Sequence, residues 1–360
     1  MNQNTIESII RSFGIPLKIR EWKPFGHGHI NDTYLLDTVS GPFILQRKNH
    51  LIFKDVKGMM NNIVLVTNHI RKRLLAKGIN DPDRRVMTYI SDPSNQYFVK
   101  DADGNFWTLF LFIKDSFGVE EVKRPEQAYT AGKAFGAFQN QLSDLDGKLL
   151  IETIPGFHNG KLRFRQFQDA IAADAAGRVG EMRQEIDKML GRADEMLRLQ
   201  DWLDSGEMPL RITHNDTKIN NVLFDKDDQI LCVIDLDTVM PGSVLFDFGD
   251  AIRTLGNTAP EDEPNLAKID FNRDYYKAFA EGYLSESSSF LKEIEKENLA
   301  YSCQYMVWEQ SIRFLADYLN GDTYYKTAYP GHNKVRTLSQ IRYLEVMDQH
   351  MDFMKQVTKQ

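Results

Sequence analysis

The segment from residue 211 to residue 253 constrains the fold of this chain more than any other segment. Its central part reads NVLFD, KDDQ and ILCVID, which predicts two short apolar strands joined by a polar turn. Because the strands of such a hairpin run in opposite directions, Asp235 returns to the end at which Asn221 begins. Mg²⁺ prefers hard oxygen ligands, so the sequence predicts that Asn221 and Asp235 together hold a phosphate-bound magnesium ion.

The residues just before this hairpin match the pattern H-x-D-x-x-x-x-N at His214, Asp216 and Asn221. This is the spacing of a kinase catalytic loop, in which a carboxylate orients the acceptor hydroxyl and an amide reaches the metal. We therefore predict that Asp216 is the catalytic carboxylate and that ATP is the phosphate donor. His214 is expected to pack and to form hydrogen bonds, and not to act as a base.

A second acidic motif, DFG at residues 247–249, resembles the metal-binding motif of protein kinases. It follows a Pro-Gly turn and lies outside the hairpin, so we assign the metal to Asp235 and not to Asp247. Asp247 is expected to brace the catalytic loop by hydrogen bonds to its backbone. Asp237 remains a candidate for one of two roles. It could support the metal ligands without contacting the metal, or it could be a ligand of a second metal.

Hydrophobic patterning divides the chain into a β-rich part, residues 1–113, and a mainly helical part, residues 114–360. This pattern predicts an α+β fold with a small nucleotide-binding N-terminal lobe and a larger helical C-terminal lobe that carries the catalytic loop and the acceptor pocket. In the first part we expect helices over residues 1–14 and 56–77, and strands over residues 18–26, 31–38, 41–48, 85–90 and 105–113. A turn, DADGN, is expected between QYFVK and the last of these strands.

The first two of these strands flank a turn that contains Gly26 and Gly28, and glycines let backbone N–H groups approach phosphate oxygens closely. Both glycines are therefore predicted to contact the nucleotide, as is the backbone at Phe112 and Ile113. The strand FILQRK offers residues 46–48, Gln-Arg-Lys, where a phosphate-pairing lysine would stand. Alternation places Gln46 and Lys48 on one face and Arg47 on the other, and does not decide between them.

The charge and cysteine content exclude several classes of protein. The net charge is −7, which disfavours a nucleic-acid binder, because phosphate neutralisation requires a basic surface. The two cysteines lie in apolar sequence, which is typical of buried thiols in a reducing compartment. No apolar run approaches the ~20 residues of a membrane span. We expect a cytoplasmic monomer that binds small molecules and neither nucleic acid nor membrane.

The motifs THNDTKINN, VIDLDTVMPGS and LFDFGDAIR together resemble the aminoglycoside phosphotransferase and choline kinase superfamily, and most closely its N-acetylhexosamine 1-kinase group. GHGHIN, FILQ, RFLADYLNGDTYY and HNKVRT extend this resemblance over most of the chain. The resemblance implies a protein-kinase-like bilobal fold and ATP- and Mg²⁺-dependent phosphorylation of the C1 hydroxyl of N-acetylglucosamine or N-acetylgalactosamine. It carries over Asp216, Asn221 and Asp235 in the roles given above, and implies acceptor contacts by His29, Asp250, Arg253, Arg313 and Tyr324.

Other interpretations remain open at this point. The acceptor of a kinase of the same fold could be an aminoglycoside, choline or homoserine, and a kinase-like scaffold could also serve a non-catalytic binding role. Arg313 lies four residues before Asp317 on a predicted helix, so that a surface ion pair between them is the alternative to an acceptor contact.

Overall fold

The computed structural model describes residues 3–26 and 30–359 of the chain. The chain divides into two compact units. The first consists of Met1–Gly118, Asp144–Pro155 and Asn221–Pro241, and the second of Val119–Ser143, Gly156–Asn220 and Gly242–Gln360. The first unit contains a five-stranded and a three-stranded sheet, and the second unit is mainly helical, which confirms the predicted α+β class.

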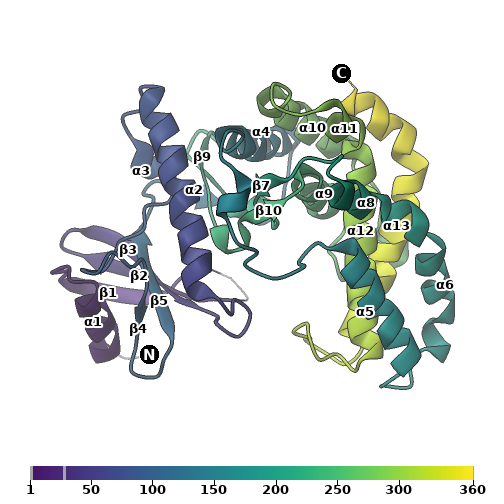
Figure 1. The fold of residues 1–360 in the computed structure, drawn as a ribbon, viewed down its shortest axis with the longest axis horizontal. Coiled ribbons are helices and arrows are strands. Elements are labelled where there is room, and N and C mark those ends of the chain that lie inside the picture. Colours follow the sequence, from purple (N-terminus) through teal and green to yellow (C-terminus); the bar gives the residue numbers. More distant parts are fainter. Residues whose placement is uncertain (1–2, 27–29, 360) are drawn as a thin grey trace. The chain divides into compact units, whose positions relative to one another are not determined.

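A five-stranded antiparallel sheet forms the centre of the first unit, in the order β1-β2-β3-β5-β4. Its strands are β1 (Ile19–Pro24), β2 (Asp32–Thr38), β3 (Gly41–Lys48), β4 (Val99–Lys100) and β5 (Phe106–Leu111). One face is apolar, and helix α1 (Gln3–Ser12) packs against it through Ile6, Ile9 and Ile10 (Figure 1). These elements confirm the predicted N-terminal helix and the strands over residues 18–26, 31–38, 41–48 and 105–113.

The long helix α2 (Val56–Ala76) also belongs to the first unit and confirms the helix expected over residues 56–77. Asp55 caps its first turn by accepting a hydrogen bond from the Gly58 N–H at 2.8 Å. The buried Asn62 side chain donates to the carbonyl oxygens of Ile151 and Val239, at 2.8 and 2.9 Å. These bonds attach two segments that are distant in sequence to α2, which explains why both belong to the first unit.

A second sheet of the first unit contains the predicted hairpin. β8 (Val222–Phe224) and β9 (Ile230–Val233) pair in antiparallel fashion, and β6 (Phe117–Gly118) adds a third strand beside β8. The polar turn between β8 and β9 is closed by Asp225, whose carboxylate accepts the N–H groups of Asp227 and Gln229 at 2.9 Å each. The hairpin is therefore confirmed, whereas β6 had no recognisable signal in the sequence.

The prediction of a strand over residues 85–90 is wrong. Residues Pro82–Arg85 form a short helix, α3, and only Tyr89 makes a β-bridge, to Phe110. β5 pairs along its length with β3, and its other edge is already occupied by β4 at Phe106 and Trp107. Only residues 109–111 remain for the segment 88–90, so pairing is limited to one bridge and its flanking bonds.

The second unit is built around α12 (Leu299–Leu319), a helix that is buried along most of its length and contacts α5, α9 and α13. Its other helices are α4 (Pro125–Gln141), α5 (Gly160–Ala173), α6 (Arg183–Gly191), α7 (Ala193–Met196), α8 (Arg198–Ser205), α9 (Val244–Leu255), α10 (Arg273–Ser287), α11 (Glu293–Glu297) and α13 (His332–Thr358). Strand β7 (Arg211–Thr213) leads into the predicted catalytic loop, and β10 (Met240–Gly242) leads into α9. Across residues 3–26 and 30–359, no helix combines the length and hydrophobicity that a membrane crossing requires.

Glycines set the close packing of α4 against α10. A Cβ atom at Gly132 would overlap the carbonyl oxygen of Phe279, and one at Gly282 would overlap that of Tyr129. The two helix backbones therefore touch at these positions. This contact fixes α4, which carries Gln139 toward the candidate site.

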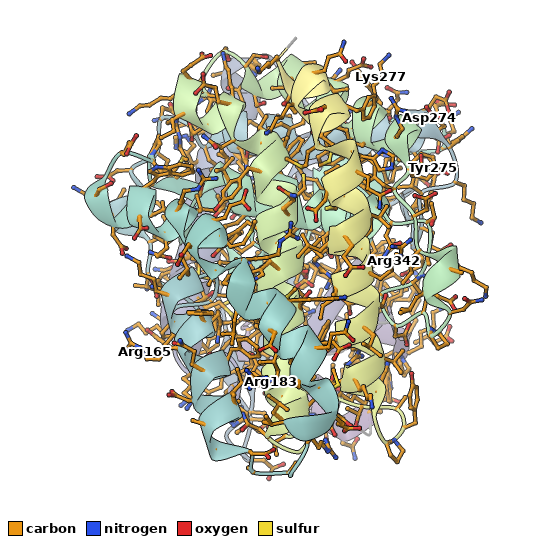
Figure 2. All side chains as sticks on the ribbon, turned by 90° about the vertical axis from the view of Figure 1, so that its right-hand side faces the viewer. Arg165, Arg183, Asp274, Tyr275, Lys277 and Arg342 are labelled. Atoms are coloured by element: carbon orange, nitrogen blue, oxygen red, sulfur yellow. The ribbon has the colours of Figure 1, made fainter. Side chains whose placement is uncertain are left out.

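Ion pairs link α6 and the residue that follows it to α13 on one face of the second unit. Lys188 on α6 pairs with Glu345 on α13 at 2.6 Å, and Arg192, which follows α6, pairs with Asp348 at 2.5 Å. Figure 2 looks onto this face, where Arg165, Arg183 and Arg342 lie on α5, α6 and α13. Exposed pairs of this kind contribute little stability each, so the buried face of α12 dominates the packing.

Candidate active site

A buried carboxylate holds the predicted catalytic loop, which we define as residues 214–220. The Asp247 oxygens accept the backbone N–H groups of His214 at 2.9 Å and of Asn215 at 2.7 Å. The Gln139 amide donates a third hydrogen bond to Asp247 at 2.7 Å. Burial raises the pKa of Asp247, and the charge of His214 and these hydrogen bonds oppose that rise. The bracing role predicted for Asp247 is confirmed.

Local hydrogen bonds give the loop its sharp turn. Asn215 has a positive φ of 63°, a conformation that asparagine tolerates better than most residues. Its side chain accepts from the Thr213 hydroxyl at 3.0 Å and donates to the Thr213 carbonyl at 3.2 Å. The His214 ring is fully buried between Phe135 and Phe138, with 5.9 Å between ring centres in each case. The packing role predicted for His214 is confirmed.

Asp216 follows this turn, and its carboxylate lies 2.9 Å from the Lys218 ammonium. The Asp216 side chain keeps 30% of its surface exposed. Burial by itself would raise the pKa of Asp216, but the positive charge and hydrogen bond of Lys218, with His214 and Arg253, lower it below its ordinary value. Asp216 is therefore ionised at neutral pH.

Two further predicted acceptor contacts, Asp250 and Arg253, lie about one and two turns along α9 from Asp247. Asp250 accepts the Thr217 N–H at 3.1 Å and the Arg253 Nε–H at 2.9 Å, and Arg253 also pairs with Glu261. Both side chains are buried. Asp247 and Asp250 therefore hold the loop on both sides of Asp216, at residues 214–215 and at residue 217.

The two predicted metal ligands lie at the same end of the hairpin in the first unit. The Ile234 N–H donates to the Asn221 carbonyl at 2.9 Å, beyond the last paired residues of β8 and β9. Asp235 follows directly and adopts a left-handed φ of 59°. Among the described residues no three His, Cys, Asp or Glu side chains gather to hold a metal. Magnesium bound to phosphates needs no such group, and one amide with one carboxylate suits it.

The three residues 46–48 of β3 have different surroundings in the first unit. Arg47 points to the apolar side, where it pairs with Asp32 in a half-exposed position. Lys48 is 1% exposed, and its ammonium lies 2.5 Å from the Asp237 carboxylate and 2.5 Å from the Gln46 amide oxygen. Asp237 also accepts a hydrogen bond from Asn31 at 2.8 Å. Lys48 thus lies buried beside Asp237, two residues after the predicted metal ligand Asp235.

The predicted nucleotide-binding turn is described only in part. Gly26 has a φ of +78°, a left-handed conformation that glycine adopts without steric cost. Gly28 and His29 lie outside the described residues. Phe112 and Ile113 follow β5, where the Phe112 ring meets Phe25 edge-on and the Ile113 carbonyl accepts from Ser116 at 2.6 Å.

Arg313 is not part of a surface ion pair with Asp317, so that alternative is wrong. Its side chain is nearly buried and lies 3.6 Å from Glu309, one turn earlier on α12. Asp317 instead accepts the backbone N–H groups of residues 323–325. These bonds order the segment that carries Tyr324, which is 63% exposed and interacts with Arg313. Arg313 and Tyr324 thus lie together in the second unit.

Several site residues had escaped the sequence reasoning. Lys218 stands two positions after Asp216, and Glu309 stands four before Arg313, so spacing could have suggested both. His158 and Gln139 are distant in sequence from every motif, and no local pattern points to them. They reach the loop only through the packing of the second unit.

Comparison with known proteins identifies what this arrangement resembles. A family model described as the phosphotransferase enzyme family matches residues 21–284. The microcompartment-associated aminopropanol kinase superposes with a TM-score of 0.59 at 15% identity, covering 98% of this chain and 99% of that chain. An aminoglycoside phosphotransferase from Alicyclobacillus acidocaldarius subsp. acidocaldarius DSM 446 gives 0.57 at 11% identity, covering 96% of each chain.

Spectinomycin phosphotransferase in complex with ADP and spectinomycin gives a TM-score of 0.51 at 16% identity, covering 99% of both chains. At such identities these likenesses establish the fold alone. They confirm the protein-kinase-like class that the sequence predicted.

Proposed function

Because this chain belongs to the phosphotransferase enzyme family and is a small-molecule kinase, we propose that it transfers the γ-phosphate of ATP to the anomeric C1 hydroxyl of an N-acetylhexosamine. The product is the sugar 1-phosphate. The observation that carries this proposal is the loop around Asp216. Asp247 and Asp250 fix its backbone, while the Asp216 carboxylate stays ionised and partly exposed.

Asp216 is proposed to orient the acceptor hydroxyl and to accept its proton as the bond to phosphorus forms. An anomeric hydroxyl is more acidic than an ordinary alcohol, so a carboxylate with a lowered pKa is still a sufficient base. Most of the rate enhancement then comes from positioning and charge neutralisation and not from strong general-base catalysis. A rigidly held loop is the structural requirement for this form of catalysis.

The first unit is proposed to bind the nucleotide and the metal. Asn221 and Asp235 would hold Mg²⁺, which when bound neutralises charge on the β- and γ-phosphate oxygens. Contacts to ATP are assigned to the backbone at Gly26, Gly28, Phe112 and Ile113. Lys48 adds a buried cation, whose present partner is Asp237.

The second unit is proposed to bind the sugar. Arg313 and Tyr324 offer donors and an aromatic surface, which suit neutral hydroxyl groups and an acetamido group. His29, Asp250 and Arg253 are the remaining proposed contacts. Cationic acceptors would favour an excess of carboxylates, and Arg313 disfavours them.

The decisive variant is Asp216→Asn. We expect kcat to fall by at least about 100-fold while the melting temperature and ATP affinity persist, because the amide keeps the shape but cannot accept the proton. Asp227→Asn, in the exposed turn of the hairpin, is the matched control. Turnover of the Asp216 variant within about threefold of wild type would mean that another group is the catalytic carboxylate.

A second candidate acceptor class comes from the fold. Structures of this fold include the aminopropanol kinase and the spectinomycin phosphotransferase named above, so an aminoglycoside, choline or homoserine acceptor is the alternative. An ADP-release assay over a panel of N-acetylhexosamines, aminoglycosides and amino alcohols separates the classes. Phosphorus NMR of the product then shows whether the phosphate is on C1.

A further inference from the structure

A buried carboxylate on α12 connects the predicted acceptor contact to the catalytic loop. Glu309 is 1% exposed, and its Oε2 atom lies 2.9 Å from the Nδ1 atom of His158. Its Oε1 atom lies 3.6 Å from Arg313 and has no hydrogen-bond partner among the described residues. The other ring nitrogen of His158 lies 3.3 Å from the backbone carbonyl oxygen of Asn215. All four residues belong to the second unit.

Glu309 is charged despite its burial. Burial would raise its pKa, but the charges of His158, Arg313 and Arg163 together with the His158 hydrogen bond lower it below the ordinary value. A charged buried carboxylate without full hydrogen bonding is costly, so it persists only where cations surround it. The network is therefore held together by charge and not only by shape.

His158 is held in one orientation. Its ring lies against Phe157 and Phe246, with centres 4.4 and 5.1 Å away. A carboxylate oxygen of Glu309 and the carbonyl oxygen of Asn215, which are both acceptors, face its two ring nitrogens. The backbone of Asn215 is thus held on both sides, at its N–H by Asp247 and at its C=O, which belongs to the peptide to Asp216, by His158.

We propose that Glu309 and His158 are positioning residues for phosphoryl transfer. They fix the peptide that joins Asn215 to Asp216, and Glu309 connects this position to Arg313. The inference rests on the proposed role of Asp216 but does not depend on which acceptor is phosphorylated. Loss of the connection rotates the Asp216 carboxylate away from its productive orientation while leaving the nucleotide groups of the first unit unchanged.

The test compares kcat and KM in four variants, with N-acetylglucosamine as acceptor. Glu309→Gln and His158→Phe should each lower kcat about 10- to 100-fold and leave KM for ATP within about twofold, because a displacement of about 1 Å has effects of this size. The kcat of the double variant should lie within about threefold of that of the slower single variant. Both residues act through the same hydrogen bond to the Asn215 carbonyl, so the second substitution has little left to remove. His158→Gln, whose amide can donate near the position of Nε2, should recover at least about tenfold over His158→Phe.

Gln304→Met is the control for general disturbance of α12. Gln304 is buried one turn before Trp308 and donates to Asp348 at 2.6 Å, away from the loop. This variant should keep wild-type kcat. The melting temperatures of all variants show whether each variant is folded. If Glu309→Gln does not fold, the comparison of kcat between His158→Phe and His158→Gln tests the positioning role by itself.

Three results would overturn the positioning role: a rise in acceptor KM alone, losses that multiply in the double variant, or equal kcat for His158→Gln and His158→Phe. Failure of the acceptor assignment is recognised separately, since wild type would then leave N-acetylhexosamines unphosphorylated. In that case the same ratios are measured on the slow hydrolysis of ATP with water as acceptor. The expected pattern among the variants is unchanged.

Discussion

Replacement of Asp247 by asparagine tests whether loop geometry, and not stability alone, governs turnover. Three donors face the carboxylate: the N–H groups of His214 and Asn215 and the amide of Gln139. Asparagine has one acceptor oxygen in place of two. Oriented to keep the bonds of His214 and Gln139, it directs its own NH₂ group at the N–H of Asn215.

The energetic effects of this substitution oppose each other. A buried N–H without an acceptor costs about 1–3 kcal/mol. The raised pKa of Asp247 shows that its charge is itself held at a cost through burial, and the neutral amide avoids that cost. We therefore expect a net loss of unfolding free energy of about 2 kcal/mol or less, which a domain of ordinary stability survives. The lost hydrogen bond also releases the backbone of Asn215, and the neutral amide does nothing to restore its position. We therefore expect kcat to fall about 100-fold.

Urea unfolding measures the stability and a coupled ADP-release assay measures kcat for the same preparations. Asp101→Asn is the matched control, because Asp101 also accepts backbone N–H groups, from Asp103 and Asn105, in a turn of the first unit. It should lose some stability and no kcat. A folded Asp247→Asn variant with kcat within about threefold of wild type would refute the bracing argument.

Two further outcomes follow from the site and the packing. The pKa of Asp216 is lowered, so kcat of the wild type should decline only as the pH falls through a value below the ordinary pKa of aspartate. In Lys218→Met the effect of burial dominates and the pKa of Asp216 rises, so the acid limb of the pH–kcat profile should move to higher pH. The control Lys226→Met, in the hairpin turn, should leave the acid limb where it is in the wild type. Gly282→Ala should lower the unfolding free energy by about 1–3 kcal/mol or more, because the new methyl group overlaps the Tyr129 carbonyl, and a urea midpoint equal to that of wild type would show that α4 and α10 separate freely.

Local sequence determined the elements whose residues interact with near neighbours. The hairpin between Asn221 and Asp235 follows from two apolar runs and an acidic turn, and Asp225 closes that turn as the composition predicts. The spacing from His214 to Asn221 and the helical period of α2 are equally local. Such patterns suffice because hydrogen bonding and side-chain alternation within a few residues decide the conformation.

Tertiary structure decided every choice that depends on what lies opposite a residue. Arg313 can reach Glu309 or Asp317 on its own helix, and only the backbone of residues 323–325, which occupies Asp317, leaves Glu309 as its partner. Residues 85–90 have the composition of a strand, but β4 already occupies part of the edge with which they would pair. Lys48 is distinguished from Arg47 by its contact with the Asp237 carboxylate, which lies almost 190 positions away in the sequence. His158 contacts Asn215, which lies 57 positions away. Periodicity in the sequence does not predict contacts between residues so far apart. The burial of a charged side chain and its pairing with an opposite charge arise only when the chain is folded.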